Sequence, residues 1–415
     1  MILIQNATVV SPAAGLNGGY DVVIDPITER IAEVALRGHV QTKEIVETID
    51  ATGLVLLPGL IDLHVHLREP GFSAKETIYT GTRAARKGGF TTVVCMPNTR
   101  PALDTVETLR ELKALCERDA VIDVRPTGAI THSIAGERLT DHDALAAEGI
   151  AAYSDDGRTT MNPDYMREVF RSSIRHGIPV MTHSEDHDLT SKLSGAASPN
   201  EAEDNIIFRD IELCEEIGGR LHVCHVSTGA AVAAIKAAKA RGVKVTCEAT
   251  PHHMALDLSM IDRKDPYTKV NPPIREEADR LAIIEGFRDG TIDAMATDHA
   301  PHEASSKEVE YNKATMGISG FETAFSVTFS TLCRDNGFSL SDLVRLTSEH
   351  PARILTLCDR GVIRAGMRAD LILVDLDAQR TVDSKDFVSK GKNTPFHGRT
   401  YYGDVVRTFV GGKYE

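Results

Sequence analysis

The stretch LPGLIDLHVHLREPG, residues 57–71, places two histidines two positions apart at the end of an apolar run. In a β-strand, residues i and i+2 lie on the same face. If residues 60–67 form a strand, then Asp62, His64 and His66 share one face of it. The other face is then apolar and carries Ile61, Leu63, Val65 and Leu67. One buried histidine usually just hydrogen-bonds to its neighbours, but two converging imidazoles favour a metal site.

Strands and helices alternate along the chain from about residue 54 to residue 357. Helical patterns precede strand-like runs in four pairs: 77–89 and 90–98, 164–177 and 178–186, 204–219 and 220–228, 277–290 and 292–302. Repeated units of this kind imply a parallel sheet, and so many in one chain favour a closed barrel. We therefore expect an α/β fold with a TIM-type (β/α)8 barrel.

The two ends of the chain have a different texture. Short runs that alternate apolar and polar residues, with turn residues between them, fill the first part and return near the end, as in residues 1–10 and 361–378. We expect residues 1–53 and 358–415 to form together a small β-sandwich domain. Residues 54–357 would then form the barrel domain.

Composition excludes several classes of protein. Hydrophobic residues make up 42% of the 415 residues and charged residues 26%, as in ordinary globular proteins. The formal charge of −14 and the lack of any Lys/Arg block disfavour nucleic acid as a partner. There is no signal-like N-terminus and no apolar run of about 18 residues, so we expect no membrane segment. The seven cysteines contain no C-x-x-C pair and fit reduced thiols, so we expect a cytoplasmic protein.

Unusual polar residues stand at the carboxyl ends of the predicted strands, where a TIM barrel builds its active site. They are His64, His66, Asn98, Asp155, Asp156, His183, His225 and Asp298. Strand alternation puts Leu221, Val223 and His225 on one face. Four histidines and at least two carboxylates would then meet in one mouth. Such a set suits Zn²⁺ or a similar ion.

Each of these residues has an alternative role. Asp298 could be a turn or capping residue, and His222 could be the ligand in place of His225. However, burying so many histidines and acids together without a cation would leave repelling carboxylates and unpaired donors. The joint placement therefore predicts a metal site.

Seven segments carry a further signal: DLHVHLREPG (62–71), VVCMPNTRPALDT (93–105), SDDG (154–157), THSED (182–186), LHVCHVST (221–228), KVNPPIR (269–275) and ATDHAPH (296–302). Together they resemble the amidohydrolase superfamily and, within it, the class I dihydroorotases. The pair of histidines alone is typical of the whole superfamily. The combination of HLREPG, MPNT and NPPIR resembles dihydroorotases, whereas allantoinases and hydantoinases differ in the latter two segments.

The resemblance implies one or two zinc ions. It assigns one ion to His64, His66 and Asp298, a second to His183 and His225, and contact with both to Asp156. Many relatives bridge two metals with a carboxylated lysine, but no lysine occurs between Lys113 and Lys192. Class I dihydroorotases use an aspartate instead. The spacing back from His183 points to Asp156, and Asp155 stays open as the alternative.

The resemblance further implies an enzyme that interconverts N-carbamoyl-L-aspartate and dihydroorotate in pyrimidine biosynthesis. Asp298 would also carry the proton from the attacking water to the leaving nitrogen. Arg68 would bind the substrate carboxylate, and Asn98 and His302 would complete that pocket. Asn271 would bind the ring amide. The rival functions are a hydantoinase or allantoinase, and an inactive homologue that acts as a structural partner of aspartate transcarbamoylase.

Two segments bear on assembly and access. The stretch 185–205 is shorter than in typical members of the family and lacks their NEG and GIP segments, a departure that concerns subunit contacts more than chemistry. The polar stretch 302–317 reads as a mobile lid over the mouth. By the resemblance we also expect a homodimer and a complex with aspartate transcarbamoylase.

Overall fold

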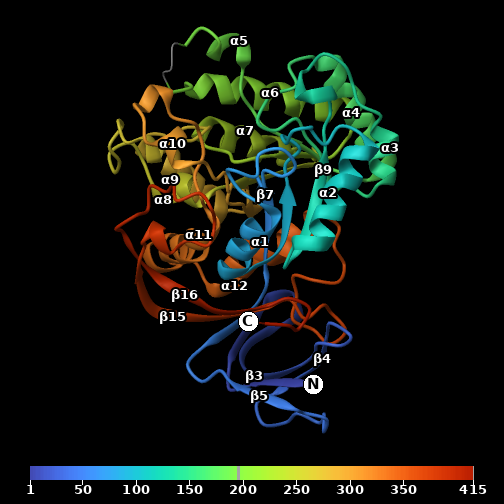
Figure 1. The fold of residues 1–415 in the computed structure, drawn as a ribbon, viewed down its shortest axis with the longest axis vertical. Coiled ribbons are helices and arrows are strands. Elements are labelled where there is room, and N and C mark those ends of the chain that lie inside the picture. The colour runs from blue at the N-terminus through green and yellow to red at the C-terminus, as the bar shows by residue number, and fades with distance from the viewer. Residues whose placement is uncertain (194–196, 415) are drawn as a thin grey trace.

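The computed structural model describes residues 1–193 and 197–414, and its centre is a barrel of parallel strands (Figure 1). The eight strands are neighbours in chain order: β7 (Leu60–Val65), β8 (Phe90–Cys95), β9 (Asp123–Gly128), β10 (Ala152–Tyr153), β11 (Val180–Thr182), β12 (Leu221–Val223), β13 (Val245–Ala249) and β14 (Ala294–Met295). Just beyond β14, the carbonyl of His299 accepts a hydrogen bond of 2.8 Å from the backbone N–H of His66. This contact joins the last strand to the first and confirms the predicted (β/α)8 barrel.

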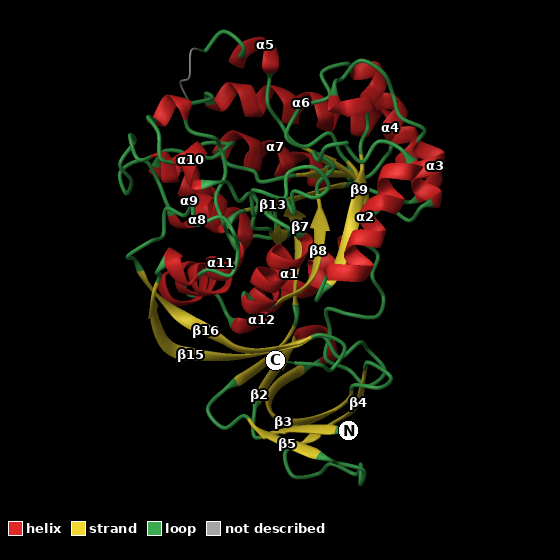
Figure 2. Cartoon of the chain, viewed as in Figure 1, coloured by secondary structure: helices red, strands yellow, loops and turns green. Residues whose placement is uncertain are grey.

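Helices cover the outside of the barrel (Figure 2). The four predicted helical runs correspond to α1 (Ile78–Lys87), α4 (Pro163–His176), α6 (Asn200–Ile217) and α9 (Glu277–Arg288). The others are α2 (Val106–Asp119), α3 (His142–Ala147), α5 (His187–Thr190), α7 (Gly229–Ala240), α8 (Pro251–Ala255), α10 (Ala304–Lys307), α11 (Phe321–Thr328), α12 (Leu340–Val344) and α13 (His350–Ile354). Local signals set their ends: α4 begins after the capping side chain of Asn162, with Pro163 at its first position, and ends at the left-handed Gly177.

Both ends of the chain form a second, eight-stranded sheet, as predicted. Its strands are β1 (Ile2–Gln5), β2 (Thr8–Ser11), β3 (Leu16–Asp25), β4 (Arg30–Leu36), β5 (Glu47–Asp50), β6 (Val55–Pro58), β15 (Leu371–Thr381) and β16 (Thr400–Phe409). β6 joins the ends, because it pairs with β2 on one side and β15 on the other. We call this unit the terminal sheet. It buries its own core, which includes Ile4, Val22, Leu56, Leu371 and Phe409.

The predicted domain boundaries stay a prediction. Residues 55–58 follow the expected start of the barrel domain at residue 54, yet the strand that they form pairs with β2 and β15 of the terminal sheet. Both chain ends lie in the lower part of Figure 1, and the arrowhead of β8 in Figure 2 points away from the terminal sheet. The carboxyl ends of the parallel strands, and with them the barrel mouth, therefore lie at the opposite end of the molecule.

Two predictions of strand phase are wrong. The pairing of β7 with β8 shifts register between Asp62 and Val65, so Leu63 packs inside the barrel while Val65 packs in the layer under the helices. Leu221 and Val223 also pack in that outer layer, whereas His225 faces the mouth with a left-handed φ of 36°. A bulge or a left-handed residue changes the face to which the following side chains belong.

Among the described residues, no helix is both long and apolar enough to cross a membrane.

Candidate active site

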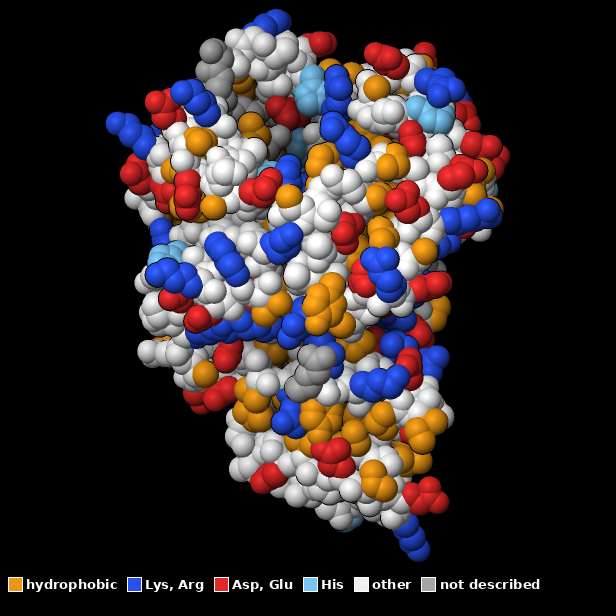
Figure 3. Space-filling view, in the orientation of Figure 1, with side chains coloured by type: hydrophobic (Ala, Val, Ile, Leu, Met, Phe, Trp, Pro, Cys, Tyr) orange, Lys and Arg blue, Asp and Glu red, His pale blue; other side chains and the backbone are white. Residues whose placement is uncertain are grey.

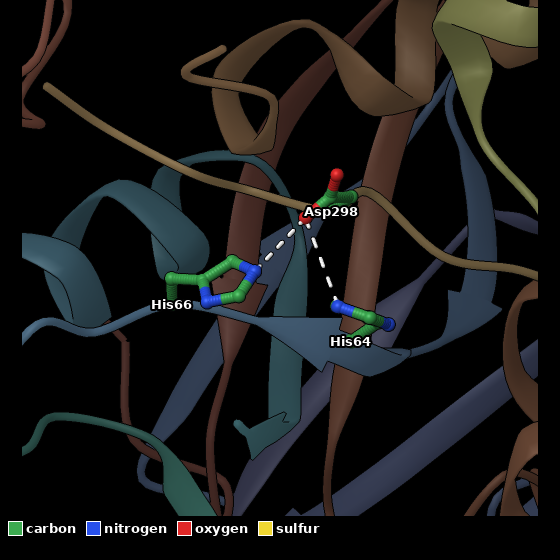
Figure 4. Close-up of side chains that lie close together, drawn as sticks. All are labelled: His64, His66 and Asp298. Atoms are coloured by element: carbon green, nitrogen blue, oxygen red, sulfur yellow. Dashed lines mark hydrogen bonds and ion pairs between the residues drawn. The ribbon is translucent and has the colours of Figure 1, made fainter. Parts of the chain in front are cut away.

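Three side chains from the first and last strands of the barrel meet at its mouth (Figure 4). His66 Nε2 lies 3.0 Å and His64 Nε2 lies 3.7 Å from Oδ1 of Asp298. The histidines come from β7 and its end, and Asp298 follows β14 with a φ of 47°. That left-handed conformation is uncommon outside glycine, but aspartate tolerates it better than most residues. The closure of the barrel therefore brings residues 232 positions apart into direct contact.

Asp156 lies at the centre of the site, close to all four histidines that we expected there. Its carboxylate oxygens lie 3.2 Å from His64 Nε2 and 3.5 Å from His66 Nε2. They also lie 3.6 Å from His183 Nδ1 and 3.7 Å from His225 Nε2. One carboxylate thus faces both of the histidine pairs that the resemblance separates.

The structure separates the alternatives that the sequence left open. The carboxylate of Asp155 points to the loop after β9, where it accepts hydrogen bonds from the N–H groups of Ile130 and Thr131 and from the hydroxyls of Thr131 and Thr160. His222 lies inside the barrel against Glu248. Asp156 and His225 therefore lie in the cluster, and Asp155 and His222 do not.

Burial and charge act against each other on the titratable groups of the site. Burial by itself would raise the pKa of Asp156, but the charge of His64 and hydrogen bonds with His183 hold that pKa well below its ordinary value. The pKa of Asp298 is also lowered, against burial, by His66 and His64. Burial would lower the pKa of His183, yet Asp156 and Glu185 raise it to about 9. The carboxylates therefore stay ionised and attract positive charge.

The donors of the mouth fit a divalent cation. Several of their buried polar atoms have no hydrogen-bond partner among the described residues: Nε2 of His64, Oδ1 of Asp156 and Nδ1 of His225. Two groups of converging donors are His64, His66 and Asp298, and His64, Asp156 and His225, with donor atoms within 4.8 Å of one another in each. Buried polar atoms normally have partners. Imidazole and carboxylate donors that lack them suit Zn²⁺ or a similar ion.

A cavity of about 210 Å³ opens beside this cluster and contains the four residues that we expected to bind substrate. Its lining includes Arg68, Asn98, Asn271 and His302. In Figure 3 a hollow in the upper part of the molecule has pale blue histidine atoms within it and Lys or Arg side chains at its edge. Apart from His64, the metal-ligand candidates therefore line the same space as the substrate-binding candidates.

Arg68 is buried without a carboxylate partner. Its Nε donates to the carbonyl of Pro301 at 3.2 Å, and its Nη2 lies 3.2 Å from Nε2 of His302. Within the described part of the chain it forms no ion pair, because Asp62 accepts from Thr297 and Glu69 accepts from the N–H of Ile78. Burial lowers the pKa of Arg68 to about 10, so the guanidinium is still charged at neutral pH. A buried cation beside a cavity can bind an anionic group of a ligand.

The other three substrate-binding candidates are partly engaged by the site itself. Asn98 Oδ1 lies 3.0 Å from His66 Nδ1, and Asn271 Nδ2 donates to Glu185 at 2.8 Å. His302 Nε2 lies 2.7 Å from the carbonyl of Met316, and burial beside Arg68 lowers its pKa to about 2. His302 is therefore neutral. The substrate-binding roles of these residues stay predictions.

Sequence reasoning missed two acids. Glu185 lies 3.4 Å from His183 Nε2, and Glu248 lies 3.3 Å from His64 Nδ1. The first is visible in the THSED segment, two positions after His183. The second was harder to find, because Glu248 lies inside a short strand whose neighbours Cys247 and Ala249 pack outward. His252, in α8, is also buried, and neither of its ring nitrogens has a hydrogen-bond partner among the described residues.

The segment predicted as a lid is tied down in this structure. The ammonium of Lys307, in α10, is buried and donates to the carbonyls of Lys269, Thr315 and Gly317 at 2.9 to 3.2 Å. Burial lowers its pKa to about 8. The mobility of the lid stays a prediction. In the shortened stretch after His183, residues 194–196 lie outside the described residues.

Comparisons with known proteins agree with the resemblance. Residues 55–414 match the model of the amidohydrolase family. A dihydroorotase of Pelotomaculum thermopropionicum is 43% identical over 424 residues, which cover 99% of this chain and 97% of that protein. A dihydroorotase of Staphylococcus epidermidis is 40% identical and covers 100% and 98%. Among solved structures, L-hydantoinase (dihydropyrimidinase) from Arthrobacter aurescens has a TM-score of 0.90 at 25% identity and covers 100% of this chain and 95% of its own.

Proposed function

The chain belongs to the amidohydrolase family and, within it, to the dihydroorotases, and we propose that its barrel mouth carries the reaction of that group. The reaction is the reversible ring closure of N-carbamoyl-L-aspartate to dihydroorotate in pyrimidine biosynthesis. In the reverse direction the enzyme hydrolyses a cyclic amide. The identity of 40 to 43% over nearly the whole chain supports this activity over that of the hydantoinases, since the L-hydantoinase from Arthrobacter aurescens is 25% identical.

The observation that carries the proposal is the buried, unpaired guanidinium of Arg68 beside the cluster of histidines and acids. Dihydroorotate and carbamoyl-aspartate carry a free carboxylate that allantoin and simple hydantoins lack. Arg68 would bind that carboxylate and so orient the ring amide towards the cluster. Asn98 and His302 would line the same pocket, and Asn271 would contact the ring amide.

We propose zinc, as one or two ions, for the cation. His64, His66, Asp156, His183, His225 and Asp298 would hold it. When bound, such a cation supplies a Lewis acid that polarises a carbonyl and makes water acidic enough to react near neutral pH. Asp298, whose carboxylate is held ionised, would accept the proton of the attacking water and return it to the leaving ring nitrogen.

A side-by-side assay tests the proposal. Purified protein supplied with Zn²⁺ is given dihydroorotate, a hydantoin and allantoin at equal concentrations, and its metal content is measured. We expect turnover of dihydroorotate well above the other two, with one to two equivalents of metal. Preference for a hydantoin or for allantoin would overturn the substrate. An absence of turnover on all three would favour the inactive structural homologue.

We also propose a homodimer in the cytoplasm that can associate with aspartate transcarbamoylase. The seven cysteines, all of them unpaired, are consistent with a reducing compartment. The dimer and the complex rest on the family alone. Size-exclusion chromatography with light scattering, with and without aspartate transcarbamoylase, tests both.

A further inference from the structure

A carboxylate lies fully buried inside the barrel, one layer below the mouth. Glu248, on β13, has no exposed surface, and its two oxygens face two histidine rings. Oε1 lies 3.3 Å from Nδ1 of His64, and Oε2 lies 3.1 Å from Nε2 of His222. The surrounding layer is apolar and contains Leu63, Val94, Met181, Cys224 and Ala296. Removing a carboxylate from water into such a layer is costly unless the charge is paired and hydrogen-bonded.

We propose that Glu248 is a positioning residue for His64, an inference that rests on the proposed function. By accepting from the Nδ1–H of His64, its carboxylate would hold the ring in one orientation and one tautomer. With a cation bound, Nε2 would be the unprotonated nitrogen that faces it, and Nε2 already lies 3.2 Å from Asp156 and 3.7 Å from Asp298. A carboxylate behind a metal-binding imidazole also increases the basicity of the ring. Glu248 would therefore increase the affinity of the mouth for its cation without touching the cation.

His222 completes the arrangement from the other side. Its Nδ1 lies 2.8 Å from the hydroxyl of Thr246, and its Nε2 lies against Glu248. A row of polar groups thus runs from Thr246 through His222 and Glu248 to His64. His222 has one nitrogen at Glu248 and one at Thr246, whereas His64 has Nδ1 at Glu248 and Nε2 at the mouth. His222 would secure the second oxygen of Glu248, so that the first stays aimed at His64.

The alternative is a purely structural role for Glu248. Asp62 is a nearby buried acid with such a role. Asp62 is buried in the same strand as His64, but its carboxylate accepts from the backbone N–H and the hydroxyl of Thr297. Those bonds tie the first strand to the segment after the last. Asp62 thus closes the barrel, whereas both contacts of Glu248 are with imidazoles. Cys224 lies next to His64 and Glu248, and one donor atom from each of the three residues lies within 4.8 Å of the other two.

The test measures Zn²⁺ affinity by competition with a chromophoric chelator, for wild-type protein and the variant Glu248→Gln. Glutamine keeps the shape and one acceptor but removes the charge, so a role in packing alone would leave the affinity unchanged. We expect the dissociation constant to rise roughly 10- to 100-fold. We also expect the absorption spectrum of the Co²⁺-loaded variant to differ from that of wild type. The control is Asp370→Asn, a buried acid paired with Arg368 far from the mouth, which should keep wild-type affinity.

The outcomes separate the role of Glu248 from the proposed function. Wild-type affinity and an unchanged Co²⁺ spectrum in Glu248→Gln would overturn the inference and leave the proposed function intact. A wild-type protein that binds no Zn²⁺ and does not turn over dihydroorotate would overturn the proposed function first. If Glu248→Gln does not fold, His222→Leu is measured instead. It keeps the acid and removes its outer partner, so weaker Zn²⁺ binding supports the inference and unchanged binding overturns it.

Discussion

Arg68 at the barrel mouth and Arg360 at the barrel base are buried to almost the same extent, with 9% and 7% of their surface exposed. Arg360 pairs with Asp123 at 2.5 Å and with Asp359 at 3.0 Å, and these acids raise its pKa against the effect of burial. Arg68 pairs with no acid in the described residues, and burial lowers its pKa. The arginine at the base thus has its charge paired within the protein, whereas the arginine at the mouth can pair with an anionic ligand.

The difference extends to the groups around each arginine. At the base, Arg368 and Asp370, just before β15, form a second pair at 3.1 Å, and Arg360 lies between Asp123 of β9 and Asp370, 3.9 Å from the latter. At the mouth, Oδ1 of Asp156, Nε2 of His64 and Nδ1 of His225 have no hydrogen-bond partner among the described residues. Complete pairing makes the base a structural joint. At the mouth the surrounding fold holds polar atoms without partners. Such atoms are free to bind a ligand.

The largest difference is expected between two acids, Asp298 at the mouth and Asp370 at the base. Asp298→Asn should lower turnover in both directions roughly 10³-fold or more, because the variant loses a cation ligand and the proton acceptor. Asp370→Asn should leave the turnover of folded protein unchanged. Steady-state rates with circular dichroism spectra check both variants, and near-normal turnover in Asp298→Asn would remove that residue from the mechanism.

The two arginines should separate stability from activity. Arg360→Met leaves the partly exposed acids Asp123 and Asp359 without their cation and removes a buried side chain, so we expect the free energy of unfolding to fall by about 1.5 to 3 kcal/mol. The kcat/KM for dihydroorotate should not change at temperatures where the variant is folded. Chemical denaturation measures the first quantity. A loss of activity without a loss of stability would contradict the assignment of the base as a structural joint.

Arg68→Met should show the reverse behaviour. Loss of one partner of a desolvated charge pair typically costs about 2 to 5 kcal/mol, which is roughly 30-fold to several thousand-fold in kcat/KM for dihydroorotate. Metal content should not change, and the free energy of unfolding should not fall, because no ion pair of the free protein is lost. Kinetics, metal analysis and denaturation are measured together. Retention of most activity would argue against a carboxylate-binding role.

Removal of the cation should affect the mouth alone. A ligand at 100 times its dissociation constant stabilises a folded protein by about 2.7 kcal/mol, so chelation should lower the melting temperature and re-addition of Zn²⁺ should restore it. Arg360→Met should show the same decrease on chelation as wild type. The variant His183→Ala should show a smaller one. An equal decrease in His183→Ala would place the cation elsewhere.

The smallest effect concerns pH and His302. Its folded pKa of about 2 lies below the ordinary value of 6.5, so the unfolded chain binds more protons between those limits. Stability from neutral His302 is therefore complete above pH 6.5 and declines below it, by about 1 kcal/mol over the first pH unit. In metal-free protein, His302→Gln should lose less stability than wild type between pH 6.5 and 5.5. Equal losses would show that His302 is not buried as a neutral ring.

Much of this architecture was accessible from local patterns. The alternation of α1 or α4 with the strands after them depends on periodicity and capping residues, which are properties of short segments. The same holds for the two-residue spacing of His64 and His66. These features predicted the barrel, the second sheet and a cluster of ligands at the strand ends.

Long-range contacts supplied the rest. Asp156 rather than Asp155 lies in the cluster because Thr131, from another loop, donates a hydrogen bond to Asp155 and keeps that carboxylate away from the mouth. His225 faces the mouth because its own backbone is left-handed, a conformation that strand periodicity does not predict. Whether Arg68 has a partner depends on every acid that the folded chain brings near it. Periodicity encodes which face a residue occupies, whereas pairing and desolvation arise only when distant segments pack together.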